Sequence, residues 1–247
     1  MRDKEAGITL SKRLQVIASF VTAGNRIADI GCDHGFVPIY LVKQLISPKA
    51  IAMDIGKGPL QRAAGHIQES GLEDRIETRL SNGMEQLKIG EVDTVILSGI
   101  GGPLMIQILE AGKEVVQSLK ELVPSPQSEV EEVRRYLTAH HYLISEEKMV
   151  LEDGKYYVVM HVVIGEQIGN ESKEWGNLEY RYGNSLLKSG EEVFLSYLRW
   201  EERTKKQLLE KLRKTKTSRS MERQKELEDD LHMIQEAWKL IKKNESK

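Results

Sequence analysis

Short apolar runs alternate with amphipathic stretches over the first two thirds of the chain, a pattern that predicts strands separated by helices. The predicted strands are residues 26–30, 50–53, 75–80 and 94–97, with a weaker fifth near 119–123. The predicted helices are residues 36–46, 57–70, 103–112 and 129–140. Strands joined by helices of this length form right-handed βαβ units, so we expect a parallel sheet covered on both faces.

A β-hairpin is predicted at the end of this sheet. Two β-rich runs, 142–151 and 156–164, flank the segment Glu152-Asp153-Gly154-Lys155, and Asp-Gly between such runs is typical of a hairpin turn. The predicted fold class is therefore α/β, a mostly parallel Rossmann-like sheet with an antiparallel terminal hairpin. This plan is similar to that of class I methyltransferases, more than to a standard dinucleotide-binding plan.

The composition changes after Gly165. Residues 166–190 have the character of a linker with some helix, and the chain is helical and highly charged from Glu191 onward. Steps of three and four residues separate Gln224, Leu227, Leu231, Ile234, Trp238 and Ile241, which is a heptad seam. A less regular stripe precedes it, at Phe194, Leu198, Leu208 and Leu212.

Residues 215–220 lie between these two stripes and suit a turn. We therefore predict an antiparallel coiled-coil hairpin within one chain and a monomer, and the alternative is a seam that dimerises between two chains. The expected domains are a catalytic domain, residues 1–165, and a helical coiled-coil domain, residues 166–247.

Length and composition narrow the class of protein. The 247 residues with 40% hydrophobic content suffice for one domain of about 150 residues and a smaller appendage. The single cysteine, Cys32, makes neither an internal disulfide nor a four-ligand zinc site, and we expect no metal. The charged start and the absence of an apolar run of membrane-spanning length predict a soluble cytoplasmic protein without a membrane partner.

The segment Asp29-Ile30-Gly31-Cys32-Asp33-His34-Gly35, between the first strand and a helix, carries the most informative chemistry. Gly31 allows the backbone to approach a ligand, and the helix points its N–H groups at the same place. When this segment is compared with the pyrophosphate fingerprint G-x-G-x-x-G, Asp33 stands at the position of the second glycine. Two carboxylates here favour the cationic sulfonium and amino groups of S-adenosylmethionine over NAD. The alternative is an ordinary turn with an Asp helix cap.

Three further strand ends carry polar or small residues. Asp54 ends the second strand, where an acid accepts hydrogen bonds from ribose hydroxyls, unless it is a solvated strand-end residue. Asn82 follows the third strand and has the groups to bind an adenine. The fourth strand ends in Ser98-Gly99-Ile100-Gly101-Gly102, where small residues keep the pocket floor open, although glycines also mark any turn.

One motif is absent. Methyltransferases that act on exocyclic amines often carry Asn/Asp-Pro-Pro-Tyr/Phe after the fourth strand, and this chain has Ser-Gly-Ile-Gly-Gly. A ring nitrogen such as N1 of adenine has a free lone pair, so it needs orientation more than a strong base. The sequence is therefore compatible with methylation at a ring nitrogen.

The motifs together resemble a known family, the bacterial tRNA adenine-N1 methyltransferases that modify position 22 (the TrmK family). The resemblance rests on LSKRL at 10–14, DIGCDHG at 29–35, AMDI at 52–55, SNGMEQL at 81–87 and ILSGIGG at 96–102, and it extends to the charged helical end. It implies S-adenosyl-L-methionine as the cofactor, tRNA as the partner and N1 of adenine 22 as the methyl acceptor. Cys32 stands where the family commonly has Ser.

The resemblance also implies the site residues. The expected cofactor contacts are Arg13, Asp29, Gly31, Asp33, His34, Gly35, Asp54, Ile55, Asn82, Gly83, Ser98 and Gly99. A guanidinium at Arg13 suits the methionine carboxylate of the cofactor. The resemblance does not settle the catalytic residue, for which Asp33 and Ser98 are our candidates. His34 is either a base or a ring packed under the loop.

Basic residues dominate one part of the helical region. Residues 203–225 contain ten basic and two acidic residues, a net charge of +8. Such a stretch is expected to bind tRNA phosphates, and the alternative is a solvated helix face. The candidate RNA-binding residues are Lys205, Lys206, Lys211, Arg213, Lys214, Lys216 and Arg219.

Three other functions are compatible with parts of this pattern. One is a methyltransferase for a small molecule or another RNA, with a helical dimerisation tail. Another is a binding module with a degenerate Rossmann domain, which the presence of Asp29 and Asp54 disfavours. The third, an NAD oxidoreductase, is disfavoured by Asp33.

Overall fold

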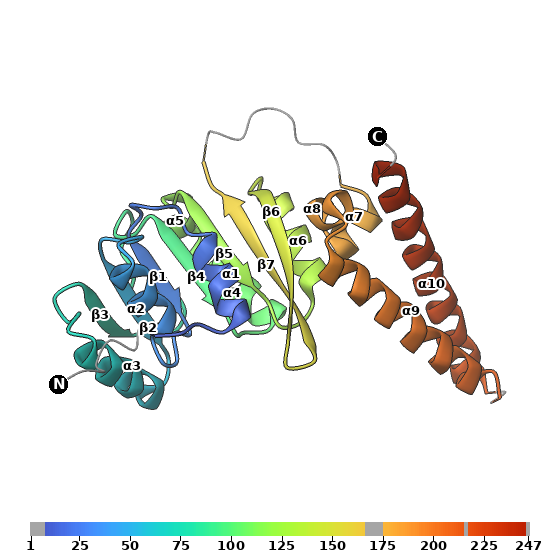
Figure 1. Ribbon diagram of the computed structural model, residues 1–247, viewed down its shortest axis with the longest axis horizontal. Helices are drawn as coiled ribbons and strands as arrows, with labels where there is room; N and C mark the ends of the chain where they lie inside the picture. The colour runs from blue at the N-terminus through green and yellow to red at the C-terminus, as the bar shows by residue number, and fades with distance from the viewer. Residues whose placement is uncertain (1–7, 166–174, 215–216, 246–247) are drawn as a thin grey trace. The chain divides into compact units, whose positions relative to one another are not determined.

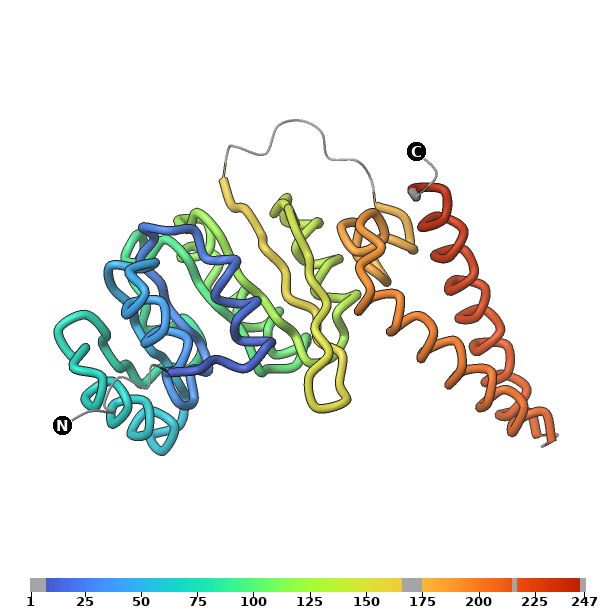
Figure 2. The backbone as a smooth tube through the Cα atoms, viewed as in Figure 1, coloured from blue at the N-terminus to red at the C-terminus, as the bar shows by residue number. Residues whose placement is uncertain are grey.

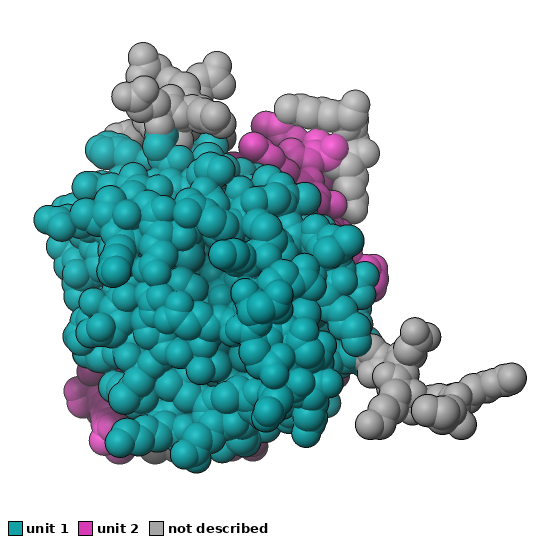
Figure 3. Space-filling view, turned by 90° about the vertical axis from the view of Figure 1, so that its left-hand side faces the viewer, with its two compact units in different colours: residues 1–173 teal, residues 174–247 magenta. Residues whose placement is uncertain are grey.

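The computed structural model describes residues 8–165, 175–214 and 217–245. The chain divides into two units, Met1–Lys173 (unit 1) and Glu174–Lys247 (unit 2), shown in different colours in Figure 3. Unit 1 contains the sheet and unit 2 is helical in its described part (Figure 1).

Unit 1 is built on a seven-stranded sheet of order β3-β2-β1-β4-β5-β7-β6 (Figure 1). The first five strands in this order are parallel to one another, and β7 is antiparallel to both β5 and β6. The predicted Rossmann-like sheet with a terminal antiparallel hairpin is therefore confirmed. The strands are β1 Ile27–Ile30, β2 Ala50–Asp54, β3 Ile76–Leu80, β4 Thr94–Ser98, β5 Glu121–Ser125, β6 Leu143–Glu152 and β7 Lys155–Val163.

Strand β5 begins two residues later than the sequence pattern predicts, at Glu121, and includes Pro124. Proline has no N–H for a ladder, so it is tolerated only where one side of the strand needs no hydrogen bond. The pairing of β5 with β7 covers only Glu121 and Leu122, which leaves Pro124 without a partner strand on that side.

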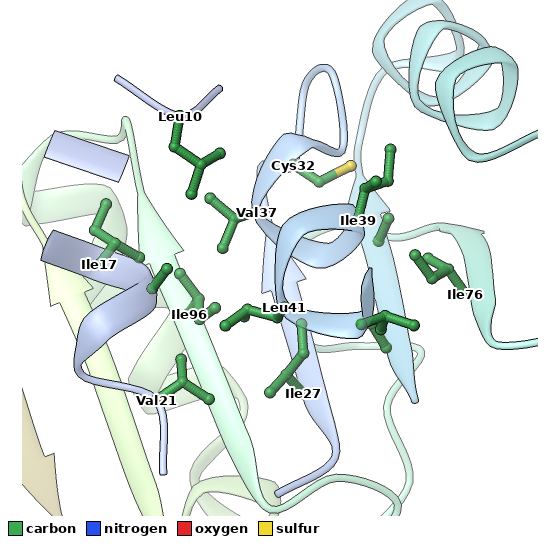
Figure 4. Packing of buried hydrophobic residues seen from close by; sticks show 14 of the residues in the cluster. Leu10, Ile17, Val21, Ile27, Cys32, Val37, Ile39, Leu41, Ile76 and Ile96 are labelled. Atoms are coloured by element: carbon green, nitrogen blue, oxygen red, sulfur yellow. The ribbon is translucent and has the colours of Figure 1, made fainter. Parts of the chain in front are cut away.

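Helices cover the sheet in two layers. In one layer α1, α2 and α3 are neighbours, and in the other α4 packs against α5 and α6. Ile17 of α1 and Leu41 of α2 are fully buried with Ile27 and Ile96 of the sheet (Figure 4). The helices are α1 Lys12–Ser19, α2 Phe36–Lys43, α3 Lys57–Glu69, α4 Gly102–Ala111, α5 Lys113–Gln117 and α6 Val130–Ala139.

The strand order places the switch point of the sheet between β1 and β4. From β1 the chain proceeds to β2 and β3 on one side, and then returns to β4 and β5 on the other. Open α/β sheets bind ligands in the crevice outside the carboxyl ends of their strands at this point. The predicted site residues of the first four strands lie at these ends or directly after them.

Unit 2 contains α7 Asn177–Tyr182, α8 Asn184–Ser189, α9 Glu192–Leu212 and α10 Ser218–Glu245. Helices α9 and α10 are antiparallel neighbours (Figure 2). Gln224 Nε2 donates to the carbonyl of Leu212 at 3.2 Å. Within the predicted seam Leu227, Ile234 and Ile241 are buried inside the single chain. The predicted antiparallel helix pair is thus present, and its description as a coiled coil stays a prediction.

One position in the predicted stripe of α9 is wrong. Leu208 is 39% exposed and Leu209 is buried. The buried positions Phe194, Leu198, Glu201 and Leu209 follow a helical period that includes a polar residue. Glu201 is buried because Arg181 and Tyr182 donate hydrogen bonds to its two oxygens, at 3.0 Å each. A search for apolar residues alone misses such a position.

No helix in the described part of the chain is long and apolar enough to cross a membrane.

Candidate functional site

Asp29 is the most deeply buried acid at the carboxyl edge of the sheet. It lies near the end of β1, is 3% exposed, and its Oδ1 has no hydrogen-bond partner among the described residues. Burial and, to a smaller extent, the nearby charge of Asp54 raise the pKa of Asp29 to about 7, against the opposing charge of Arg13. A buried carboxylate beside another acid favours a cationic ligand group.

Arg13 provides the opposite charge. It lies in the first turn of α1, its side chain is 18% exposed, and its Nη1 is buried without a hydrogen-bond partner among the described residues. Its guanidinium stacks over the ring of Tyr157, 5.1 Å from the centroid. An unpaired buried N–H of a guanidinium is costly, so this atom favours an anionic partner such as a carboxylate.

The β6–β7 hairpin holds Arg13 in place. Glu152, the last residue of β6, accepts hydrogen bonds from the Ser11 hydroxyl and from the Arg13 backbone N–H, at 3.1 Å each. A carboxylate at a helix N-terminus is favourable for the helix dipole. Glu152 and Tyr157 are site residues that the sequence analysis missed, because nothing in their local pattern distinguishes them from other hairpin residues.

The loop after β1 is tightly bound to its neighbours. The N–H groups of Gly31 and Cys32 both donate to the carbonyl of Met53, at 2.8 and 3.0 Å. Gly31 has φ of 78°, and a Cβ there would lie 3.6 Å from the carbonyl oxygen of Ser98. The loop therefore brings the ends of β1, β2 and β4 together. Burial raises the pKa of the Cys32 thiol, which keeps it protonated and unreactive.

Asp33 does not have the free carboxylate that the sequence suggests. Its side chain is 56% exposed and its Oδ1 accepts a hydrogen bond from Arg62 of α3 at 2.5 Å. His34 stacks on Phe36 and His66, with ring centroids 5.1 and 5.6 Å apart. The structure thus shows His34 packed among rings beside the loop. Arg62 and His66 are 29 and 32 residues further along the chain, so spacing alone does not indicate them.

Gly35 is the N-cap residue of α2, with φ of 69°. A Cβ at this position would lie 3.2 Å from the Ala63 Cβ, so the glycine permits close packing of α2 and α3. Its role in the structure is therefore to place the helix N-terminus close to the loop.

Asp54 and Ile55 follow β2. Asp54 is half-buried and its Oδ1 accepts a hydrogen bond from the Gly56 N–H at 2.8 Å, which fixes the carboxylate orientation. Ile55 is 71% exposed. A fixed carboxylate next to an exposed apolar side chain suits a ribose and the face of a base.

Asn82 and Gly83 follow β3. Asn82 is exposed and its Nδ2 donates to Glu85 Oε1 at 2.7 Å, which leaves its carbonyl oxygen available. Gly83 has φ of 57°, and a Cβ there would lie 2.9 Å from two side-chain carbons of Ile108. Only glycine fits this turn without displacing α4.

Ser98 and Gly99 end β4. Ser98 is half-buried and pairs in register with Ser125 at the end of β5. Gly99 has φ of 80° and is exposed. The structure therefore brings the predicted residues of four strands to one edge of unit 1, together with Arg13 from α1.

The predicted RNA-binding residues belong to unit 2. Lys205 is 17% exposed and pairs with Asp230 at 2.5 Å, and Lys206 and Arg213 pair with Glu202 and Glu228. Lys216 lies outside the described residues. The other three, Lys211, Lys214 and Arg219, are exposed and form no ion pair with a described residue.

Within the described ranges no three His, Cys, Asp or Glu side chains are grouped so as to hold a metal ion.

Comparisons with known proteins identify the family of this chain. Residues 10–160 match the family model described as "Methyltransferase domain". The tRNA (adenine(22)-N(1))-methyltransferase of Bacillus subtilis (strain 168) is 31% identical over 93% of this chain and 97% of the relative.

Two solved structures are also similar over most of their length. The crystal structure of the B. subtilis M1A22 tRNA methyltransferase TrmK has a TM-score of 0.81 at 31% identity, over 93% of this chain and 98% of that one. The structure of M. capricolum TrmK with S-adenosyl-homocysteine has a TM-score of 0.80 at 27% identity, over 95% of this chain and all of that one. With matching family, length and fold, the chain belongs to the tRNA (adenine(22)-N(1))-methyltransferases.

Proposed function

We propose that this protein transfers the methyl group of S-adenosyl-L-methionine to N1 of adenine 22 in tRNA. Family membership supports the reaction and the acceptor. The observation that carries the cofactor assignment is the pair of buried polar atoms Arg13 Nη1 and Asp29 Oδ1, which have opposite charges and no partners among the described residues. A free amino acid group, with one carboxylate and one ammonium, satisfies both.

The remaining strand ends suit the nucleoside part of this cofactor. Asp54 is oriented to accept hydrogen bonds from ribose hydroxyls. Ile55 offers an apolar contact for a base, and Asn82 and Gly83 offer polar groups at its edge. When bound, the cofactor supplies an electrophilic methyl group on a sulfonium. Gly31, Gly35 and Gly99 give the backbone conformations that keep this edge accessible.

The acidic residues of the site favour the positive charge that is on the sulfonium before methyl transfer and on the adenine afterwards. Attack by the N1 lone pair moves that charge onto the adenine ring, so no proton has to leave during transfer. We propose Asp33 and Ser98 as the catalytic residues, Asp33 through its negative charge and Ser98 by orienting the base. The ion pair of Asp33 with Arg62 favours an electrostatic role over proton abstraction.

Unit 2 is proposed to bind tRNA, through basic residues at the end of the helix pair. Lys211, Lys214 and Arg219 are the best candidates because they are exposed and form no ion pair with described residues. Lys206 and Arg213 can exchange surface ion pairs for phosphate contacts at small cost. Lys205 is the weakest candidate, because it lies between Asp230 and Glu201.

The seam of α10 supports a monomer, since Leu227, Ile234 and Ile241 are already buried within one chain. We also propose that the protein acts in the cytoplasm, without a metal ion and away from membranes, as suits an enzyme of tRNA. The proposed division of labour is methyl transfer by residues 1–165 and tRNA binding by residues 166–247.

The test is methyl transfer from labelled S-adenosylmethionine to unmodified tRNA transcripts, with the product mapped by mass spectrometry. A transcript with guanosine at position 22 is the matched control. We expect N1-methyladenosine at position 22 and no label in the control. Bound cofactor without transfer to any tRNA would contradict the acceptor and redirect the search to another RNA or a small molecule.

A further inference from the structure

The loop after β5, residues 126–129, is locked to the loop after β4. Gln127 N–H donates to the carbonyl of Ile100 at 2.9 Å, and Gly102 N–H donates to the carbonyl of Ser128 at 3.1 Å. A Cβ on Gly102 would lie 2.6 Å from the Ser128 oxygen, so only glycine allows this contact. The two loops therefore hold each other in a fixed position.

The side chain of Gln127 is exposed and lies beside the predicted catalytic strand end. A Cβ on Gly99, the residue after Ser98, would lie 4.0 Å from Gln127 Nε2. The amide makes no hydrogen bond to a described residue. Ser125, paired in register with Ser98, is fully buried, and its hydroxyl also lacks a partner among the described residues. This part of the edge thus contains an exposed amide and a buried hydroxyl that form no hydrogen bond within the described part of the chain.

The order of the sheet shows which part of the reaction these groups face. The proposed cofactor contacts belong to α1 and to the ends of β1, β2, β3 and β4. Strand β5 follows β4 on the side away from β1. An acceptor base that approaches Ser98 opposite the cofactor contacts therefore meets the loop after β5.

We propose that the Gln127 side-chain amide binds the target adenine at its N6 and N7 atoms and so leaves N1 free for methylation. The carbonyl oxygen accepts a hydrogen bond from the N6 amino group, and Nε2 donates to N7, which is the bidentate pairing that glutamine forms with adenine. Guanine presents two acceptors, O6 and N7, so the carbonyl of the same amide would face an acceptor. Gln127 is therefore a specificity residue, and this inference rests on the proposed function.

The test combines a protein variant with a changed base. Wild type, Gln127→Ala and the control Gln117→Ala are assayed on transcripts with adenosine or 7-deazaadenosine at position 22. Gln117 is an exposed glutamine at the end of α5, before β5 begins, so it lies away from the carboxyl edge. Calorimetric cofactor binding by each variant shows that the site has folded.

We expect Gln127→Ala to lower kcat/KM on adenosine by about 10- to 100-fold, and Gln117→Ala to change it by less than about twofold. The 7-deaza substrate should be slower with wild type, and the ratio between the substrates should fall toward one in Gln127→Ala. The ratio of kcat/KM on the two substrates is compared between enzymes, so the intrinsic reactivity of the two bases cancels. A merely structural effect of the mutation would leave this ratio unchanged.

Two results would overturn the assignment: full activity of Gln127→Ala, or an equal substrate ratio in both enzymes. A wild-type enzyme that binds cofactor but methylates no adenosine at position 22 would instead contradict the proposed function, and this inference with it. The two failures are thus distinguishable.

Discussion

Substituting Asp29 by Asn is expected to stabilise the cofactor-free protein while weakening cofactor binding. Burial, with the charge of Asp54, raises the pKa of the carboxyl from 3.8 to about 7 in the folded state. In the unfolded chain the carboxyl ionises near its ordinary value. The folded protein therefore loses stability as the pH rises from about 4 to 7, and the loss is complete above pH 7.

The size of the effect follows from this difference. A pKa raised by about three units lowers the free energy of unfolding by about 4 kcal/mol at pH 8. At pH 5, where the folded carboxyl is protonated, the loss is only about 1.5 kcal/mol. An amide is neutral at both values, so Asp29→Asn removes the penalty. The variant should gain up to about 4 kcal/mol at pH 8 and clearly less at pH 5.

Hydrogen exchange of the peptide that contains β1 is the suitable measurement, in the absence of cofactor. All three tryptophans, Trp175, Trp200 and Trp238, lie in unit 2, so their fluorescence reports the other unit and serves as an internal control. Asp33→Asn is the matched variant, because it makes the same change at an exposed carboxylate of the same loop.

An Asp29→Asn protein that is no more protected than wild type at pH 8 would show that the buried carboxylate does not destabilise the fold. A gain of the same size at pH 5 and pH 8 would indicate a packing effect instead, because packing does not titrate. A similar pH-dependent gain in Asp33→Asn would show that the effect does not depend on burial.

Three other predictions follow from the charges. Cofactor affinity of the wild type should be about tenfold weaker at pH 6 than at pH 8, because only ionised Asp29 pairs with an ammonium, and calorimetry should show no such change in Asp29→Asn. Burial acts to raise the pKa of Glu121. The hydrogen bonds to its carboxylate, of which that from His161 is the strongest, outweigh this effect and lower the pKa to about 2. Glu121→Gln should therefore cost up to about 3 kcal/mol at pH 7, and urea unfolding should show this difference shrinking as the pH falls from 4.5 toward 2. Replacing Lys211 and Lys214 together by Ala should weaken tRNA binding and reduce the salt slope by about 2, whereas Lys239→Ala, which removes a lysine paired with Glu236, should leave the slope unchanged.

Much of unit 1 is predictable from local pattern. The strands are continuous apolar runs because both sheet faces are covered, and Asp153-Gly154 marks the hairpin because both residues adopt positive φ. The strand-end residues Asp29, Asp54 and Ser98 are recognisable in the sequence, because carboxyl ends of parallel strands meet at one edge. Helix α1 was not predicted as an element, since eight residues carry little periodic signal.

Contacts between distant segments were not predictable. Arg13 is oriented by Glu152, 139 residues away, and Asp33 is paired with Arg62 of another helix. Gln127 carries no motif, and it becomes a candidate only because its loop lies beside Gly99. Each of these depends on which elements pack together, and a pattern along one element contains no such information.

The charges of the helical region separate most clearly what the sequence determines from what the tertiary structure decides. Ten of the twelve charged residues between 203 and 225 are basic, and this is a property of the sequence alone. The antiparallel packing of α9 and α10 then places Glu228 beside Arg213 and Asp230 beside Lys205. Sequence therefore determined the composition of the surface, whereas the tertiary structure decided which charges stay free, because Coulomb interactions depend on distance in space and not on separation along the chain.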